Sequence, residues 1–165
     1  MGEYRHEKVF VGRAGVGVCR LRPRQRVLYL ASPLWIDRVV SEAQPTVAVA
    51  QTVAAGEVTG VDFVHKGKGA ASVIRDGDAT IVRFTDFEVT NGPGLRVYLV
   101  KHDNPRESRD VTDSEWVSLG ELKGNIGDQN YTVPSDIDIS QYGSVVIWCE
   151  PFSVLFAGAT LTPAV

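Results

Sequence analysis

The fold is decided by residues 70–84, AASVIRDGDATIVRF. Two runs rich in β-branched residues, 70–75 and 79–89, flank the pair Asp76-Gly77. A two-residue type I′ turn needs positive φ at both central residues, and Asp-Gly tolerates that conformation. The stretch therefore predicts two antiparallel strands joined by a tight hairpin at Asp76-Gly77.

The same pattern continues from Gly56 to the end of the chain, with short apolar runs separated by Gly, Asp, Asn and Pro. It predicts an all-β domain, an antiparallel β-sandwich or flattened barrel of about eight strands, preceded by an N-terminal leader. Residues 91–94, NGPG, predict a turn, and residues 102–114 a longer polar loop. Strands are expected at 57–65, 70–75, 79–89, 95–101, 117–122, 129–133, 144–152 and 154–161.

Side-chain alternation predicts which faces of two strands are buried. Phe84 and Phe87 would lie on opposite faces of a regular strand. We therefore expect a kink or bulge near Thr85 that allows both side chains to pack in the core. The strand 144–152 is apolar on both faces, which predicts that a loop or a partner covers the second face. Cys149 shares a face with Val145 and Ile147 and is expected to point inward near one end of the domain.

Composition describes a folded, acidic domain behind a basic leader. Of the 165 residues, 44% are hydrophobic and 22% are charged, which is ordinary for a globular protein with a core. The net charge of -3 conceals an asymmetry, because residues 1–26 carry seven Lys or Arg against two acids. The remainder is acidic and would repel a phosphate backbone, so we expect no nucleic acid partner.

The N-terminal segment has two interpretations. Residues 27–36, VLYLASPLWI, form an apolar run too short for a bilayer, which needs about 20 residues. It is either part of a membrane anchor with its basic residues on the cytoplasmic side, or an amphipathic leader that packs on the domain. We divide the chain into a leader with a partial anchor-like segment, 1–45, and a β domain, 46–165.

Four segments in this order resemble the DM13 family, which is proposed to transfer electrons: Val61–His65, Phe84–Leu99, Leu119–Tyr131 and the strand with Cys149. The resemblance covers residues 56–162. It implies a small β domain whose characteristic cysteine, here Cys149, is a redox thiol or binds a prosthetic group such as haem. Bacterial relatives are short and anchored by one N-terminal helix, which implies a domain that is membrane-anchored or secreted, outside the cytoplasm.

The resemblance implies that Cys149 acts as a free thiol or as a haem ligand, and a single unpaired cysteine adds a third form, an intermolecular disulfide that links a homodimer. His65, which precedes a glycine-rich turn, is the candidate for the second haem ligand. The apolar surroundings and Glu150 predict a raised pKa for the thiol, which disfavours the reactive thiolate. The alternatives are that Cys149 is a small buried apolar residue and that His65 is a polar loop residue. Likewise, Tyr98, Tyr131, Trp116 and Trp148 are interpreted as core aromatics with polar tips at the surface.

The sequence thus predicts an extracytoplasmic electron-transfer module that acts through Cys149 on an unknown redox partner protein and has no catalytic activity of its own. The alternative is a binding or adhesion β-sandwich with a structural Cys149. The two cysteines, 19 and 149, are too far apart for a metal knuckle, and no EF-hand spacing occurs, so no metal site is expected. No nucleophile motif accompanies any serine, which argues against hydrolysis.

Overall fold

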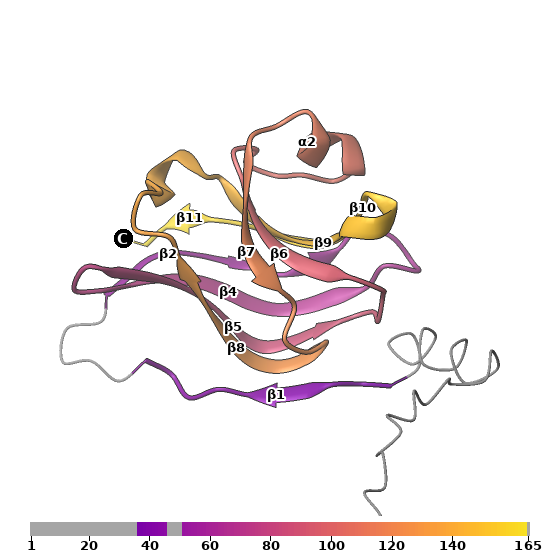
Figure 1. The fold of residues 1–165 in the computed structure, drawn as a ribbon, viewed down its shortest axis with the longest axis horizontal. Coiled ribbons are helices and arrows are strands. Elements are labelled where there is room, and N and C mark those ends of the chain that lie inside the picture. Colours follow the sequence, from indigo (N-terminus) through magenta and orange to yellow (C-terminus); the bar gives the residue numbers. More distant parts are fainter. Residues whose placement is uncertain (1–35, 46–50, 165) are drawn as a thin grey trace, which may run out of the picture. The chain divides into compact units, whose positions relative to one another are not determined.

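The computed structural model describes residues 36–45 and 51–164, which form two β-sheets that face each other (Figure 1). The predicted all-β sandwich is confirmed. In spatial order, one sheet contains β1 (Val39–Ser41), β8 (Ile126–Val133), β5 (Ala79–Val89), β4 (Gly67–Asp76), β2 (Gln51–Glu57) and β11 (Thr162–Pro163). The other contains β3 (Thr59–Gly60), β10 (Val154–Thr160), β9 (Ser144–Cys149), β6 (Leu95–Val100) and β7 (Trp116–Glu121).

The hairpin predicted from residues 70–84 joins β4 and β5. Asp76 pairs with Ala79, so the two loop residues are Gly77 and Asp78 rather than Asp76 and Gly77. Only Gly77, with φ 56°, has a positive φ in this loop. Glycine at the first central position is the pattern of a type II′ turn. The hairpin prediction is confirmed, whereas the predicted type I′ geometry is wrong.

The bulge expected near Thr85 is present in β5. Asp86 has a φ of 49°, and the pairing of β5 with both β4 and β8 shifts in register at this point. As a result, Phe84 and Phe87 are each only 1% exposed, and their ring centroids lie 4.8 Å apart. A bulge adds one residue to a strand and turns the next side chains to the other face, which places both phenylalanines in the core between the sheets.

The strand expected at 57–65 is not continuous. β2 ends at Glu57, β3 has only two residues, and the chain then forms a loop up to Lys66. The Asp62 carboxylate accepts hydrogen bonds from the backbone N–H groups of Val64 and His65, both at 2.7 Å. A short acidic side chain that binds the following backbone competes with the pairing of strands, so this part of the prediction was wrong.

The polar loop between β6 and β7 contains a helix that the sequence analysis missed, α2 (Ser108–Thr112). The Asp110 carboxylate accepts the N–H groups of Arg106 and Glu107 at 2.7 and 3.0 Å, which fixes the start of this short helix. Val111 packs on the outer side of the five-stranded sheet in a second apolar cluster with Tyr98, Val100, Val146, Trp148 and Leu155. The expectation that a loop covers the second face of the Cys149 strand is confirmed.

Part of the predicted leader is attached to the six-stranded sheet. β1 pairs in parallel with β8, from Val39 opposite Ile126 to Ser41 opposite Asp128. The Glu42 carboxylate then accepts hydrogen bonds from Lys123 Nζ at 2.7 and 3.0 Å. The basic segment and most of the apolar run lie outside the described residues. Among residues 36–45 and 51–164, no helix has the length and apolar character that a membrane span requires.

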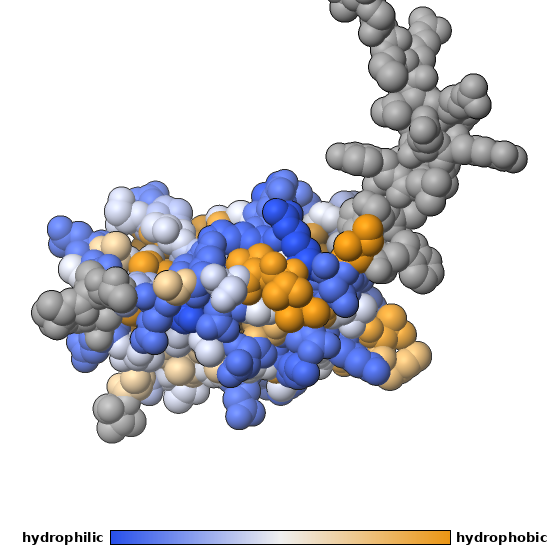
Figure 2. All heavy atoms as spheres, turned by 90° about the horizontal axis from the view of Figure 1, so that it is seen from below, coloured by the Kyte–Doolittle hydropathy of each residue, from blue (hydrophilic) through white to orange (hydrophobic). Residues whose placement is uncertain are grey.

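The surface seen from below is mostly hydrophilic, with apolar atoms in several separate patches (Figure 2). The large apolar side chains that are exposed in the described residues are Ile36, Val39, Phe63, Val64, Trp116 and Phe152. Isolated apolar side chains are normal on protein surfaces. Of these residues, Trp116 lies on β7, and Phe152 follows Cys149 by three positions in the chain.

Candidate functional site

Cys149 is the last residue of β9 and points into the core, as the sequence predicted. It is 1% exposed and belongs to the apolar cluster between the sheets, together with Val145 and Ile147. Its neighbours across the sheet are Leu95 of β6 and Val154 of β10. The short 3-10 helix η3 (Glu150–Phe152) follows directly. It contains Pro151, which has no N–H group to continue the sheet. The thiol therefore lies at the end of the sandwich, under the connecting turns.

One turn covers the sulfur directly. The thiol donates a hydrogen bond to the carbonyl oxygen of Pro93, with 3.1 Å between Sγ and oxygen. Pro93 lies between two glycines that are tightly packed: a Cβ on Gly92 would lie 2.7 Å from the ring of Phe156, and one on Gly94 would lie 2.8 Å from Pro151. Gly94 also has a φ of 58°, a conformation that favours glycine. The turn 91–94 is thus a close-fitting cover over Cys149.

Burial keeps the thiol protonated. Loss of solvent raises the pKa of Cys149, and a backbone hydrogen bond from Phe152 lowers it to a smaller extent. The raised pKa agrees with the sequence analysis, but Glu150 is not its cause. The Glu150 carboxylate points to Arg96, at 2.7 Å from Nε, and to the Tyr98 hydroxyl, at 3.2 Å.

His65 lies in the loop that follows β3 and has partners of its own. Its Nδ1 is 2.8 Å from the Asp62 carboxylate, and its ring centroid is 4.4 Å from that of Phe156. The hydrogen bond from His65 lowers the pKa of Asp62 to about 2. Within the described residues, no hydrogen bond joins His65 to Cys149. His65 is thus a partly exposed loop residue, whereas Cys149 is in the core.

The pair Cys149 and His65 does not fit haem in this conformation. An axial ligand must present its sulfur or nitrogen to an open, largely apolar pocket. The Cys149 thiol is instead enclosed and bonded to Pro93, and one nitrogen of His65 is bonded to Asp62. In addition, the described residues contain no group of three or more His, Cys, Asp or Glu side chains placed to hold a metal ion.

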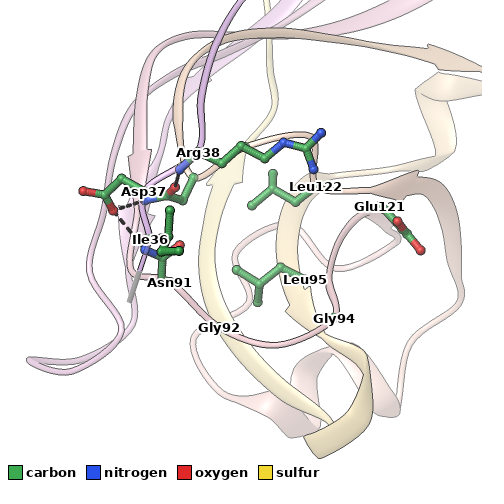
Figure 3. A pocket seen from close by; sticks show the side chains of 11 residues that line it. Ile36, Asp37, Arg38, Asn91, Gly92, Gly94, Leu95, Glu121 and Leu122 are labelled. Atoms are coloured by element: carbon green, nitrogen blue, oxygen red, sulfur yellow. Dashed lines mark hydrogen bonds between the residues drawn. The ribbon is translucent and has the colours of Figure 1, made fainter. Parts of the chain in front are cut away.

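A cleft of about 510 Å³ lies on the outer side of the turn that covers Cys149 (Figure 3). Gly92 and Gly94 of the turn line it, and Leu95 and Leu122 form its apolar wall. At its other side, the Asp37 carboxylate accepts a hydrogen bond from Asn91 at 2.9 Å. Cys149 itself does not line the cleft; the turn lies between them, with its glycines at the cleft and its Pro93 carbonyl on the thiol.

The comparisons with known proteins agree with the resemblance found in the sequence. The family model described as "Electron transfer DM13" matches residues 61–161. The chain belongs to the DM13 family. A search of curated proteins and a search of solved structures found no significant match. The matched part of the DM13 domain includes the turn 91–94 and Cys149, which is the only cysteine within it.

Two contacts in this DM13 domain, one made by Cys149 and one by the adjacent Glu150, were not predicted from the sequence. The Pro93 carbonyl binds the thiol, and Glu150 binds Tyr98. A backbone carbonyl carries no sequence signal of its own, so the contact with Pro93 was hidden. The placement of Tyr98 beside Trp116 and Trp148 was also hidden, because it depends on the pairing of β6 with both β7 and β9.

Proposed function

We propose that this DM13 domain transfers electrons outside the cytoplasm and that Cys149 is its redox-active group. Membership of a family described as electron transfer supports a redox role. The observation that carries the assignment to Cys149 is the placement of the one thiol in the matched region directly beneath a tightly fitted turn that borders a surface cleft. This arrangement allows the reactivity of the thiol to depend on a local opening.

In the closed conformation the thiol is inert, because the thiolate is the reactive form and burial raises the pKa of Cys149. Displacement of the turn 91–94 frees the sulfur from Pro93. The thiolate then attacks one sulfur of a partner disulfide, forms a mixed disulfide, and releases the other partner sulfur as a thiolate. Attack on this mixed disulfide by Cys149 of a second copy yields a disulfide-linked homodimer and a second partner thiolate. Two domains thus supply the two electrons.

The rate at which Cys149 reacts with a thiol reagent in the folded protein tests this proposal. We expect a Cys19→Ser variant of the full chain to react completely with a thiol reagent in native buffer, at a rate set by a local opening. The opening free energy, obtained from the labelling rate relative to that of the unfolded chain, should be smaller than the free energy of global unfolding from urea. Equality of the two values would mean that Cys149 reacts only in the unfolded protein.

Two glycine variants separate local from global opening. Gly94 and Gly77 both have a positive φ, 58° and 56°, so alanine at either costs roughly 1–2 kcal/mol of backbone strain. Only Gly94 belongs to the cover of Cys149, and a Cβ on Gly77 would meet nothing within 4 Å. We expect Gly94→Ala to accelerate labelling about tenfold, and Gly77→Ala to leave it unchanged. Equal acceleration in both variants would contradict a local opening.

The second candidate function is a binding or adhesion domain with a structural cysteine. The exposed fraction of Cys149, 1%, and its hydrogen bond to Pro93 favour it, because buried cysteines are often small core residues. If the labelling rate of Cys149 changes in every variant as the free energy of global unfolding changes, the result would support this function over the redox proposal.

The location outside the cytoplasm is supported by the basic residues 1–26, followed by the apolar run 27–36. When the full chain is produced in a bacterium, we expect it in the membrane or exported fraction and accessible to protease in intact spheroplasts. Recovery in the cytosolic fraction, with complete protease protection, would contradict this location.

A further inference from the structure

Three aromatic side chains lie in a row on the outer side of the five-stranded sheet: Trp116 of β7, Tyr98 of β6 and Trp148 of β9. The rings of Trp116 and Tyr98 are stacked, with centroids 4.5 Å apart and an interplanar angle of 11°. The centroids of Tyr98 and Trp148 are 6.4 Å apart, at 28°. The three strands are neighbours in the sheet (Figure 1). The row therefore runs across the sheet and ends at the residue before Cys149.

The two ends of the row differ in exposure. Trp116 is 48% exposed, whereas Tyr98 and Trp148 are 2% and 5% exposed. A dissolved reagent or a partner protein can therefore contact the indole of Trp116 but not the rings behind it. An electron can pass between stacked rings more readily than through saturated side chains, because their π orbitals overlap.

Tyr98 has a proton acceptor. Its hydroxyl donates a hydrogen bond of 3.2 Å to one oxygen of the Glu150 carboxylate, and the other oxygen binds Arg96 Nε at 2.7 Å. A phenol that loses an electron becomes a strong acid and must release its proton. The carboxylate of Glu150 is in place to accept that proton, while Arg96 fixes its orientation.

We propose that Trp116 and Tyr98 form a path for single electrons between the protein surface and the buried part of this aromatic row, with Glu150 as the proton acceptor of Tyr98. A one-electron oxidant takes an electron from Trp116. The resulting indole radical cation takes an electron from Tyr98, whose proton moves to Glu150. The products are the reduced oxidant, restored Trp116, a neutral Tyr98 radical and protonated Glu150. This inference goes beyond the proposed function, since no thiol has to be exposed.

The test is photochemical oxidation of the full chain with a ruthenium tris-bipyridine complex, oxidised by flash and quench, followed by electron paramagnetic resonance of frozen samples. We expect a tyrosyl radical that disappears in Tyr98→Phe. It should also be lost in Trp116→Phe, which preserves an aromatic ring at the surface but resists oxidation. Tyr142→Phe, at a partly buried tyrosine outside the row, is the matched control and should retain the Tyr98 radical.

A Tyr98 radical of the same yield in Trp116→Phe would overturn the path, as would the absence of that radical from the wild-type protein. In Glu150→Gln we expect the radical to be lost, because the amide cannot accept the proton; full yield there would overturn the role of Glu150. The same measurement on Cys149→Ser distinguishes this inference from the proposed function. The Tyr98 radical should form without the thiol, and its loss in this variant would contradict a path made of aromatic rings.

Discussion

Replacement of Arg83 by methionine is expected to lower the free energy of unfolding by about 3 kcal/mol. The Arg83 side chain is 8% exposed and forms an ion pair with Asp128 on the neighbouring strand β8. The same guanidinium donates hydrogen bonds to the carbonyl oxygens of Glu42 and Ala43, at 3.1 and 3.3 Å, and to Asn130 at 2.9 Å. Methionine fills similar space but leaves the Asp128 charge without its cation.

Urea unfolding measures this loss, and the matched control is Lys68→Met. Lys68 pairs with Glu88 on the same sheet, but the two side chains are 71% and 50% exposed. Exposed ion pairs contribute about 0–1 kcal/mol, so this control should be close to the wild-type protein. If Arg83→Met is as stable as Lys68→Met, the contacts of the buried Arg83 guanidinium contribute no more to stability than the exposed ion pair does.

The fold was predictable from the sequence where local chemistry and burial agree. The apolar runs on both sides of Gly77 predicted the β4–β5 hairpin, and the need to bury both Phe84 and Phe87 predicted the bulge between them. The errors occurred where a polar side chain or a distant strand decides the structure. Asp62 ends a strand by binding the backbone, and β1 depends on a parallel partner more than 80 positions away in the chain.

The candidate site was predictable only in part. Alternation along the strand indicated that Cys149 points inward, and its apolar neighbours indicated a raised pKa, which the structure confirms. The hydrogen bond to Pro93 could not be predicted, because it depends on how the turn 91–94 folds back over β9. The row of three aromatic rings likewise depends on strand order, which a periodic pattern does not specify.

Alkaline pH is expected to destabilise the domain through Tyr131. This side chain is 3% exposed, and burial raises its pKa from 10.0 to about 12. The unfolded chain therefore releases this proton near pH 10, whereas the native protein retains it up to about pH 12. Below pH 10 both states are protonated and the native state has its full stability. The contribution is lost as the pH rises through this window, and two pKa units correspond to about 2.7 kcal/mol.

Tyr131→Phe isolates that contribution. At pH 8 the variant should be less stable than the wild-type protein by about 1 kcal/mol, because the phenol donates a hydrogen bond to the Gln129 side chain at 2.7 Å and accepts one from the Lys123 N–H at 3.0 Å. As the pH rises from 8 to 12, the wild-type protein loses stability through Tyr131 and the variant does not. The difference in the free energy of unfolding between the two proteins should therefore become smaller and then change sign. Urea unfolding midpoints of both proteins, measured from pH 8 to pH 12, test this prediction, with the two values at pH 8 as the internal reference.

A difference in stability that stays constant from pH 8 to pH 12 would mean that Tyr131 ionises alike in the native and unfolded states. In that case its hydroxyl would not be shielded from water by the core that also encloses Cys149.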